Sequence, residues 1–528
     1  IHAIDSIFNL KITPWVRDMR RVMYCGEWLQ SHSLHIHMLA APDFLGFNSV
    51  IEMAEDYPDE VKRGLQLQAL GNDLIGLLGG RSVHPVGVCA GGFYKAPDMD
   101  RVQSLVQRLK SALPEAEALL RWTTSLDLPD DQQDFVSVAM RHENEYPLNE
   151  GRIVSDQGLD ISIDEYEQHF RELHIPHSTA LHSLLHDKPY LVGPLARINL
   201  NQDKLPESLR ALIKECGLTF PSRNMFHSIH ARAIEIYFGI LEATRILEDY
   251  TLPNSSHIKP TVQSGVGFGC SEAPRGLLWH RYELDDNGLV KSARIVPPTS
   301  QNQARIEEDL RSSLQFLGLD NDEGVLRLHA EKVIRNYDPC ISCATHFLDL
   351  KLQRQSNPSG RLVSNKYSEK SHCFNNPSPS NTKIIGVGSP SGSDTLGLEV
   401  IARLQQDKDL ISKGYRDNNF SALDRPGMSL LEQFNGFDNI VLIDAVNSAG
   451  KPPPGKSGEI LIFTPQELEE HCSLNISSHD LGVLEALALG DKLGKLPTIF
   501  IVGMNIKHIE KVHKSDVLLL TDYIKQLI

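Results

Sequence analysis

Cysteine is scarce in this sequence, with eight residues among 528. Small secreted domains that rely on disulfides carry cysteine at a much higher density, so the count excludes a disulfide scaffold. A reducing compartment, the cytoplasm, is therefore the expected location. Only one pair is closely spaced, Cys340 and Cys343. Four others stand alone and are interpreted as buried thiols: Cys25, Cys89, Cys216 and Cys270.

Long apolar runs and an excess of positive charge are also absent. Apolar runs such as Asn439–Val446 and Thr498–Met504 are far shorter than the ~20 residues of a membrane-spanning helix, so no membrane span is expected. Lysine and arginine total 52 against 68 acidic residues, a net charge of −16, which disfavours nucleic acid as a partner. No signal peptide opens the chain. Because the chain begins with Ile1 inside a helical pattern, we expect the true N-terminus to precede it.

What is present has the balance of a globular protein, with 41% hydrophobic and 23% charged residues. The length predicts two to four domains. Residues 1–352 are rich in helical patterns, residues 353–382 are polar and rich in Pro, Ser and Asn, and residues 383–528 alternate strands with helices. The sequence thus predicts a multidomain chain: a mainly α-helical (α+β) domain, a flexible linker, and an α/β sandwich with a mostly parallel sheet.

Two segments of the first block show its expected structure. Phe226–Tyr250 has apolar side chains at helical spacing and no proline, which predicts a helix. Tyr282–Leu284 and Ser292–Val296 have the composition of strands. The run Asp285-Asp286-Asn287-Gly288 between them is typical of a hairpin turn, so these strands are expected to pair in antiparallel fashion.

The segment with the highest density of reactive side chains is Asp338-Pro339-Cys340-Ile341-Ser342-Cys343-Ala344-Thr345-His346. Two cysteines three residues apart can present both sulfurs to one metal ion, and thiolates favour zinc, nickel, copper or iron–sulfur centres. Half of a zinc site, a redox pair or two buried thiols are equally compatible with this spacing. The covalent haem signature is excluded, because Ala344 follows Cys343 where a histidine is required.

Several further motifs lie in the first block, in this chain order: Gly26-Glu27-Trp28-Leu29-Gln30-Ser31-His32, Gly91-Gly92-Phe93-Tyr94, Ser271-Glu272-Ala273-Pro274-Arg275-Gly276, Arg294-Ile295-Val296-Pro297-Pro298-Thr299-Ser300 and Ile334-Arg335-Asn336-Tyr337. Together with the cysteine pair they resemble the large subunit of nickel–iron hydrogenases, over about residues 1–350. The sequence around residues 294–350 is most similar to the cytoplasmic, bidirectional NAD(P)-linked group, also called sulfhydrogenases.

The resemblance implies a hydrogenase fold and a centre in which four thiolates hold nickel, two of them bridging to an iron that carries cyanide and carbon monoxide. Cys340 would be a terminal nickel ligand and proton acceptor, and Cys343 a bridging ligand. Arg275 would lie above the open metal position, where a guanidinium can donate hydrogen bonds to a cyanide and polarise bound H₂. Asp43 would orient Arg275.

The same resemblance implies the surroundings of the iron. Thr299 or Ser300 would hydrogen-bond the second cyanide, with Pro298 beside them. Local sequence alone favours simpler interpretations, namely a salt bridge between Arg275 and Glu272 and a helix N-cap at the two hydroxyl residues.

The resemblance is incomplete at the start of the chain. The family carries another cysteine pair, in a motif resembling Cys-Gly-Ile-Cys-Pro, just before the helix that opens this sequence. The sequence therefore supplies only Cys340 and Cys343 of the four thiolates. A chain limited to these two would be an endopeptidase precursor without redox activity, which is the alternative function. A non-catalytic scaffold, like a respiratory complex I subunit, is a third hypothesis that the retained pair disfavours.

Two further patterns carry less weight. Ser264-Gly265-Val266-Gly267-Phe268-Gly269 lacks the strand-to-helix context and the Lys-Ser/Thr of a phosphate loop, so nucleotide binding is rejected there. His32, His35 and His37 share one expected helix and could hold a metal ion, but packed or hydrogen-bonded histidines are the favoured interpretation.

In the second block, Gly386-Val387-Gly388-Ser389-Pro390-Ser391-Gly392-Ser393-Asp394 follows a strand and precedes a helix. A dinucleotide loop is disfavoured, because the Asp394 carboxylate would occupy the field that a pyrophosphate needs. Asp444 ends a strand and His479 begins a helix, so the three side chains could form an open metal site. Helix capping by Asp394 and His479, and a solvated strand end at Asp444, are the simpler interpretations.

The second block carries further motifs: the Gly-x-Gly start, Asp424-Arg425-Pro426-Gly427, Ile443-Asp444-Ala445, Pro454-Gly455, Ser478-His479-Asp480-Leu481-Gly482 and Ile501-Val502-Gly503. With these, residues 383–505 resemble the hydrogenase maturation endopeptidases, which remove a C-terminal extension from the large-subunit precursor once nickel is loaded. The resemblance implies that Asp394, Asp444 and His479 recognise nickel.

The fusion of the two blocks suggests self-processing. Family cleavage falls after the histidine of the cysteine motif, which is the bond between His346 and Phe347 here. The function expected from the sequence is a hydrogenase catalytic subunit, for reversible H₂ oxidation, that carries its own processing peptidase. Expected partners are an iron–sulfur small subunit, because cluster-type cysteine runs are absent, together with NAD(P)-linked diaphorase subunits and nickel-insertion maturation proteins.

Overall fold

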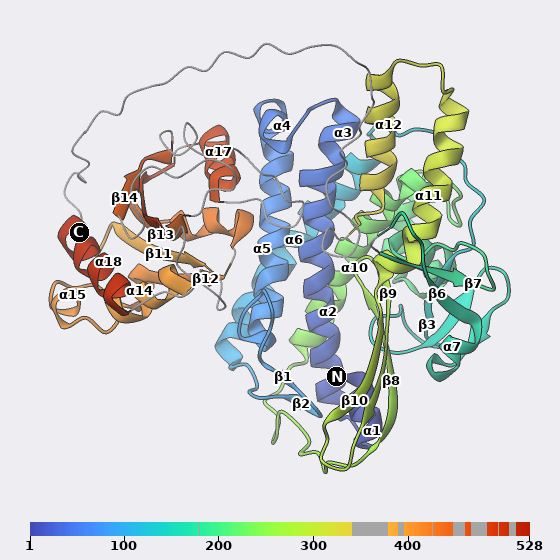
Figure 1. Cartoon of the computed structure of the whole chain (residues 1–528), viewed down its shortest axis with the longest axis horizontal. Helices are drawn as coiled ribbons and strands as arrows, with labels where there is room; N and C mark the ends of the chain where they lie inside the picture. The colour runs from blue at the N-terminus through green and yellow to red at the C-terminus, as the bar shows by residue number, and fades with distance from the viewer. Residues whose placement is uncertain are drawn as a thin grey trace. The chain divides into compact units, whose positions relative to one another are not determined.

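The computed structural model describes residues 1–178, 180–339, 378–388, 395–424, 426–446, 460–465, 483–494, 496–505 and 514–528. The chain divides into two compact units, Ile1–Thr345 and His346–Ile528, each of which is described by itself (Figure 1). The expected domain and linker bounds, 1–352, 353–382 and 383–528, stay predictions. In the part of the chain that is described, no helix is both long enough and apolar enough to cross a membrane.

Long helices form the centre of the first unit (Figure 1). α2 (Pro14–Leu34) packs against α5 (Pro58–Gly79) and α10 (Ser228–Glu248), and α10 also packs against α6 (Met99–Thr124). Their buried apolar faces share one core, and α10 confirms the helix expected over Phe226–Tyr250. The other helical segments are α1 (His2–Ile7), η1 (His35–Ala40), α3 (Ala41–Leu45), α4 (Val50–Asp56), η2 (Ile163–Glu165), α7 (Tyr166–His169), α8 (Pro194–Asn201), η3 (Gln202–Lys204), α9 (Glu207–Glu215), η4 (Met225–His227), α11 (Pro298–Leu317) and α12 (Glu323–Asn336).

The start and the end of α2 have different local causes. Pro14 occupies the first turn, where its missing N–H costs no helical hydrogen bond, and Oγ1 of Thr13 accepts a bond from the N–H of Val16 at 3.2 Å. At its C-terminal end α2 passes into the π-helical turn η1 and then into α3. Wider turns of this kind are frequent near functional sites, and the sequence pattern did not predict this one.

Two glycines let α2 and α5 approach closely. A Cβ atom on Gly71 would lie 2.5 Å from the backbone nitrogen of Gln30 and 2.6 Å from the carbonyl oxygen of Gly26. A Cβ atom on Gly26 would in turn lie 2.9 Å from the carbonyl oxygen of Gly71. Since these contacts are with backbone, a side chain at either position would force the helices apart.

Gly71→Ala is therefore expected to lower the free energy of unfolding of the first unit by about 1–3 kcal/mol, the usual cost of overpacking. Gly76→Ala is the matched control in the same helix. Nothing lies within 4 Å of its Cβ position, so it should raise stability by up to about 1 kcal/mol through helix propensity. Tryptophan fluorescence during denaturant unfolding measures both, because Trp15, Trp28, Trp122 and Trp279 all lie in this unit. Equal effects of the two substitutions would contradict the close approach.

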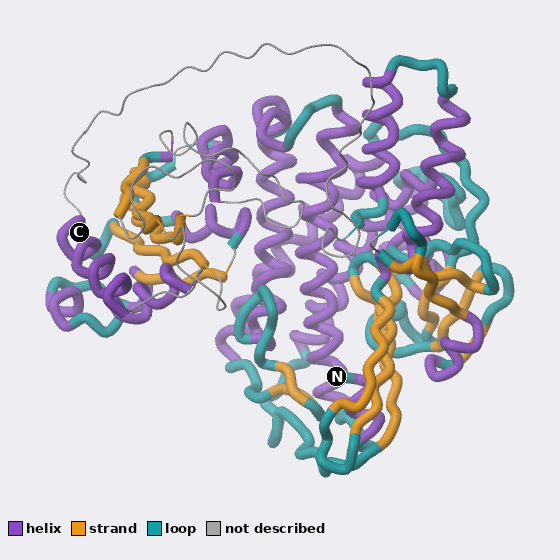
Figure 2. The backbone as a smooth tube through the Cα atoms, in the orientation of Figure 1, coloured by secondary structure: helices purple, strands orange, loops and turns teal. Residues whose placement is uncertain are grey.

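The named strands of the first unit pair in antiparallel fashion, and Figure 2 shows them in orange. The largest joins β10 (Val290–Val296), β9 (Gly276–Leu284) and β8 (Gly265–Ala273) in that order. It confirms the predicted hairpin, in which Oδ1 of Asp285 accepts bonds from the N–H groups of Asn287 and Leu289, both at 2.9 Å. The glycine run 264–269 enters β8, in line with the rejection of a phosphate loop. The remaining strands are β1 (Val88–Cys89), β2 (Gly92–Phe93), β3 (Val138–Arg141), β4 (Arg152–Ser155), β5 (Asp160–Ile161), β6 (Phe170–His174) and β7 (Leu181–Leu185).

The second unit contains a five-stranded, mainly parallel sheet, as the sequence predicts. The strand order is β12-β11-β13-β15-β14, and only β14 runs antiparallel to its neighbour β15. Figure 1 shows α14 and α18 on one side of this sheet and α17 on the other. The elements are β11 (Thr382–Gly388), α14 (Leu396–Leu404), α15 (Lys408–Ser412), η6 (Asp417–Asn419), β12 (Phe420–Asp424), η7 (Gly427–Phe434), β13 (Asn439–Val446), β14 (Ile460–Phe463), α17 (Val483–Leu493), β15 (Thr498–Asn505) and α18 (Lys514–Leu527).

The glycines that open this unit serve packing. A Cβ atom on Gly386 in β11 would lie 2.1 Å from the carbonyl oxygen of Gly397 in α14, and a Cβ on Gly397 would lie 2.3 Å from the carbonyl oxygen of Val387. The strand and the helix thus touch through their backbones, which gives Gly386 a role in packing.

Candidate active site

The four residues Arg335 to Asp338, which end just before Pro339 and the cysteine pair, are each bonded to a different element. They form the C-terminal end of α12 and the residues directly after it. Their partners, in order, are Asp43 in α3, Ser228 in α10, Asp309 in α11 and Arg275 in the turn between β8 and β9. This four-residue segment, called the anchor segment below, is therefore fixed from four directions.

Asp338 precedes Cys340 by two residues in the sequence, and it is bonded to Arg275. Nε of Arg275 donates to the backbone carbonyl of Asp338 at 2.6 Å, and Nη2 donates to Oδ1 of the same residue at 2.9 Å. Burial alone would raise the pKa of Asp338, but the charge of Arg275 outweighs it and holds this pKa below its ordinary value. Asp338 is therefore ionised at neutral pH and fixes the guanidinium through two atoms.

The position of Arg275 follows from the hairpin that carries it. Ala273 and Gly276 are paired across the end of β8 and β9, so Pro274 and Arg275 form the tip. Gly276 has a φ of +133°, and a Cβ there would lie 2.8 Å from the backbone nitrogen of Gly193. Only glycine meets both demands without strain, and the tip is thereby held against the segment before α8.

Arg197 in α8 holds the same hairpin tip by its main chain. Its Nη1 donates to the carbonyl of Ala273 at 2.8 Å, and its Nη2 donates to the carbonyl of Pro274 at 2.9 Å. The guanidinium also forms ion pairs with Glu235 at 2.7 Å and with Glu272 at 3.0 Å. All three charged side chains are fully buried. The two residues before Arg275 are thus bonded to an ionic cluster in the core.

The two carboxylates of this cluster differ in charge. Burial raises the pKa of Glu272 to about 7. Burial also opposes ionisation of Glu235, but the bidentate contact with Arg197 lowers its pKa to about 2. Burial lowers the pKa of His32, the neighbour of Glu235 at 2.9 Å, to about 4, so this imidazole is neutral. The cluster therefore contains one firmly paired charge and one carboxyl that titrates near neutral pH.

The three histidines His32, His35 and His37 are packed side chains, as the favoured interpretation predicts. His32 bonds to Glu235, Nε2 of His35 bonds to the carbonyl of Arg335 at 2.8 Å, and Nδ1 of His37 bonds to the carbonyl of Ser33 at 2.9 Å. All three are almost completely buried. The interpretation as hydrogen-bonded core histidines is confirmed, and His35 adds a further bond to the anchor segment.

Pro298, Thr299 and Ser300 form the first turn of α11 and are buried. Oγ of Ser300 donates to the carbonyl of Pro297 at 3.0 Å, and the helix has no side-chain N-cap. The next residue, Gln301, donates from Nε2 to the carbonyl of Leu277 at 2.5 Å. Because Leu277 follows Arg275 by two residues, α11 begins beside the hairpin that carries Arg275.

Two expected contacts are corrected by the structure. Asp43 does not orient Arg275, because its Oδ1 accepts from Arg335, while Arg275 is held by Asp338. The salt bridge from Arg275 to Glu272 is also wrong, since Glu272 pairs with Arg197. Asp43 and Arg275 nevertheless bind the same anchor segment. Asp43 contacts Arg335 at its start, and Arg275 contacts Asp338 at its end.

Several predicted residues lie outside the described part of the chain: Cys340, Cys343, His346, Phe347, Asp394 and His479. Of the three residues expected to recognise nickel in the second unit, Asp444 alone is described. It lies near the carboxyl end of β13, half-buried, opposite Gly503 in β15. Asp424 ends the parallel strand β12 at the same edge of the sheet, which is where sheets of this type bind ligands.

Sequence reasoning missed the residues that position the expected ones. Asp338 stands directly before the Pro-Cys step, and an acidic residue at that place was a usable signal. Arg197 and Glu235 carried no local signal, because a charged residue in a helical pattern is expected to face solvent. Only their burial in α8 and α10 identifies them as partners.

Comparisons with known proteins agree with the division of the chain into two units. The sequence profile described as nickel-dependent hydrogenase matches residues 184–346, and the profile described as hydrogenase maturation protease matches residues 425–524. Sulfhydrogenase 1 subunit alpha of Pyrococcus furiosus is 30% identical over 343 residues, which cover 63% of this chain and 79% of that protein. The beta subunit of the NAD-reducing hydrogenase HoxS of Cupriavidus necator is 28% identical over 390 residues, which cover 64% and 78%.

A solved structure gives the same result for the fold. The crystal structure of an NAD⁺-reducing [NiFe]-hydrogenase in the H₂-reduced state superposes with a TM-score of 0.60 at 25% identity. The superposition covers 65% of this chain and 83% of that chain.

Proposed function

The chain belongs to the nickel-dependent hydrogenase family, and we propose that its first unit interconverts H₂ with protons and electrons at a nickel–iron centre that Cys340 and Cys343 help to hold. A hydrogenase maturation protease domain follows in the same chain. The observation that carries the proposal is the anchor segment, because its four bonds fix the chain just before the cysteine pair and join Asp338 to Arg275.

The charge balance around Asp338 supports an anionic centre at this place. Arg232 and Arg275 line one small cavity together with Asn336 and Tyr337. Burial lowers the pKa of Arg232 to about 10, so this side chain still carries its charge at neutral pH. Its Nε is buried and makes no hydrogen bond to the described residues. Two guanidinium groups therefore face one carboxylate, and thiolates with cyanide ligands would balance the excess positive charge.

In this proposal the centre, when bound, supplies the metal ions that take up and split H₂, with cyanide and carbon monoxide on the iron. Cys340 and Cys343 provide thiolates to it, and Cys340 accepts a proton. Thr299 or Ser300 donates a hydrogen bond to a cyanide, and Pro298 keeps the start of α11 in place. All three lie buried in that first turn.

Arg275 has the task of donating hydrogen bonds at the open side of the centre. Asp338 binds its Nε and Nη2, which leaves Nη1 without a hydrogen bond to any described residue. With two of its five N–H donors bonded to Asp338, the guanidinium is pre-organised, so little freedom is lost when the remaining donors bind.

The second unit has the task of processing the precursor. We infer that it removes the peptide after His346 once nickel is present, and that Asp394, Asp444 and His479 recognise the nickel ion. The position of Asp444 at the carboxyl edge of a parallel sheet supports this role. Electrons would leave through an iron–sulfur small subunit to NAD(P)-linked diaphorase subunits in the cytoplasm, and nickel-insertion maturation proteins would load the metal.

Nickel supplied to the full-length chain should yield a product that ends at His346, as mass spectrometry would show. The same sample should gain H₂ oxidation as the product accumulates. His479→Ala should leave the precursor uncut, and Asp491→Ala, an exposed residue of α17, should cut normally. Cleavage that is independent of nickel, or unchanged in His479→Ala, would contradict the processing proposal. A rate that falls on dilution would place the cleavage between chains.

A further inference from the structure

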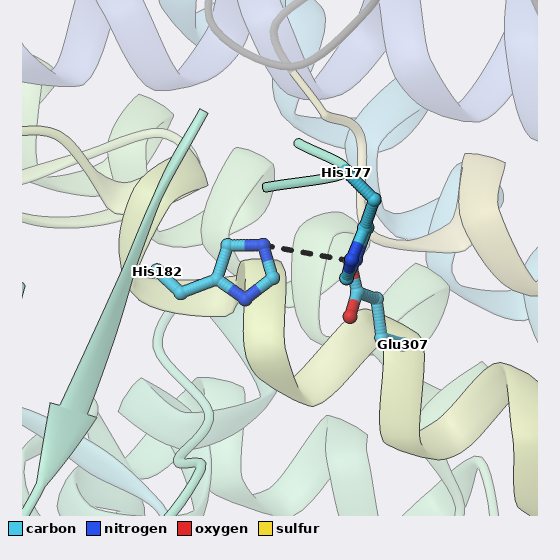
Figure 3. A group of neighbouring side chains, drawn as sticks. All are labelled: His177, His182 and Glu307. Atoms are coloured by element: carbon cyan, nitrogen blue, oxygen red, sulfur yellow. Dashed lines mark hydrogen bonds and ion pairs between the residues drawn. The ribbon is translucent and has the colours of Figure 1, made fainter. Parts of the chain in front are cut away.

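Three potential metal ligands meet in the first unit, away from the residues of the proposed centre. His177 precedes β7, His182 lies in β7, and Glu307 lies in α11. Figure 3 shows both imidazole rings directed toward the Glu307 carboxylate. One donor atom from each of the three lies within 4.8 Å of the other two, and among the described residues this is a group of the size that a metal ion requires.

The distances between the potential ligand atoms of this group are close to those in a metal coordination shell. Nε2 of His177 lies 3.1 Å from Oε1 of Glu307, and Nε2 of His182 lies 3.4 Å from the same oxygen. Ligand atoms at the usual ~2.0–2.1 Å from a tetrahedral zinc ion are about 3.4 Å apart. The side chains could therefore reach one ion with a small shift of His177, which is exposed.

His182 gives a second, independent indication. Its side chain is 5% exposed, and its Nε2 is buried without a hydrogen-bond partner among the described residues. Buried imidazole nitrogens are normally satisfied, so an unsatisfied one directed at a carboxylate requires an explanation.

We propose that His177, His182 and Glu307 bind a divalent transition-metal ion of the zinc class. Two imidazoles and one carboxylate are a recognised zinc donor set with an open fourth position. Mg²⁺ and Ca²⁺ are excluded as occupants because they select oxygen ligands. None of the three side chains belongs to the anchor segment or to the cysteine motif, so the site is independent of the proposed hydrogenase activity.

The ion would strengthen a link between two elements that already meet by packing and through the contact of His177 with Glu307. His177 and His182 belong to the β6–β7 hairpin and its connection, and Glu307 belongs to α11, which packs on β7. The first turn of α11 carries Pro298, Thr299 and Ser300. A bound ion would thus restrict the movement of the helix that begins at the proposed centre, without contacting that centre.

Zinc uptake by the full-length, chelator-treated chain tests the site. The wild type should bind one Zn²⁺ ion more than the double variant His177→Ala, Glu307→Gln, measured by equilibrium dialysis and elemental analysis. His174→Ala is the matched control, because His174 is an exposed histidine of the same hairpin, and it should retain the wild-type uptake. Comparison between variants removes the contribution of zinc bound by cysteines elsewhere. Equal uptake by all three proteins would overturn the proposal.

Cobalt spectroscopy provides a second measurement with a milder variant. Co²⁺ at this site should give visible bands without the sulfur-to-metal charge transfer that a cysteine site produces. Glu307→Gln keeps the size of the side chain and should weaken Co²⁺ binding at least about tenfold, which is the lower end expected when a metal site loses a supporting group. Mg²⁺ should not displace the ion. Bands that are identical in wild type and Glu307→Gln would show that the ion binds elsewhere.

Discussion

Replacing Arg275 by lysine is expected to lower H₂ oxidation about 10²- to 10³-fold, the range seen when one pre-organised donor is removed from an active site. Lysine keeps the positive charge but has no planar fork, so it cannot bond to the carbonyl and the carboxylate of Asp338 in the way that Nε and Nη2 do. The measurement is H₂-dependent dye reduction. Nickel and iron contents and the infrared bands of cyanide and carbon monoxide are determined on the same sample.

Arg281→Lys is the control for this substitution. Arg281 lies in β9 of the same hairpin, is partly exposed, and has its nearest acidic partner, Glu167, at 3.8 Å. Its replacement should leave turnover unchanged. Full activity in Arg275→Lys would contradict the proposed role. Loss of the metal ions together with the activity would show that Arg275 serves assembly of the centre rather than turnover.

A double variant tests whether Arg275 and Asp338 act as one unit. Asp338→Asn removes the charge that fixes the guanidinium, and it should lower turnover by itself. In the Arg275→Lys background the same change should have little further effect, because the contact that it weakens is already lost. Independent effects that multiply would indicate two separate roles.

Arg197→Met is expected to lower the free energy of unfolding of the first unit by about 3–5 kcal/mol, the cost of leaving buried charge without its partner. Methionine fills much of the space but leaves Glu235 and Glu272 without a cation, and it removes the donors to the carbonyls of Ala273 and Pro274. It also removes a cation from the face of Trp28, 4.4 Å from the ring centroid. The fluorescence of that tryptophan should therefore report the change directly.

The effect should depend on pH in a defined direction. Glu235 has a pKa of about 2 in the folded wild type, below its ordinary value of 4.5. Its contribution to stability is therefore complete above pH 4.5 and is lost as the pH falls toward 2. The stability difference between wild type and Arg197→Met should shrink across that range.

Arg245→Met provides the comparison for Arg197→Met. Arg245 lies in α10, is 60% exposed on its side chain, and pairs with Glu242 at 2.9 Å. The guanidinium of Arg245 is exposed and Glu242 keeps its ion pair with Arg21, so the loss should be several times smaller, about 0.2–1 kcal/mol. If both substitutions destabilise the unit equally, the buried cluster does not have the role assigned to it.

The second unit could be predicted in detail because its strands are short apolar runs with clear ends. The apolar run Asn439–Val446 forms β13, and the run Thr498–Met504 lies in β15. The hairpin around Asp285 was equally readable, since its turn residues and its strands agree. The π-helical turn η1 was not, because an apolar pattern at helical spacing does not distinguish a wide turn from an ordinary one.

The sequence predicted candidate residues for the site, but it did not predict which of them form pairs. Arg275 was singled out by the motif around it, but its partner Asp338 is 63 residues away in sequence and is selected by the fold. Asp43 was assigned to the wrong arginine for the same reason, since it binds Arg335 at the start of the segment whose end is bound by Arg275. Charge pairing across elements depends on packing, which a single sequence does not display.

The hydrogen bonds from Arg197 to the hairpin tip determine which positions can vary in sequence. Its bonds end on main-chain oxygens at positions 273 and 274, which every amino acid possesses. Substitutions of those two side chains can therefore accumulate while Arg275 keeps its place, provided that the turn retains its course. Apart from Gly276, the strictly limited positions lie elsewhere in the sequence, in α8 and α10, where the bidentate contact between Arg197 and Glu235 fixes both residue types.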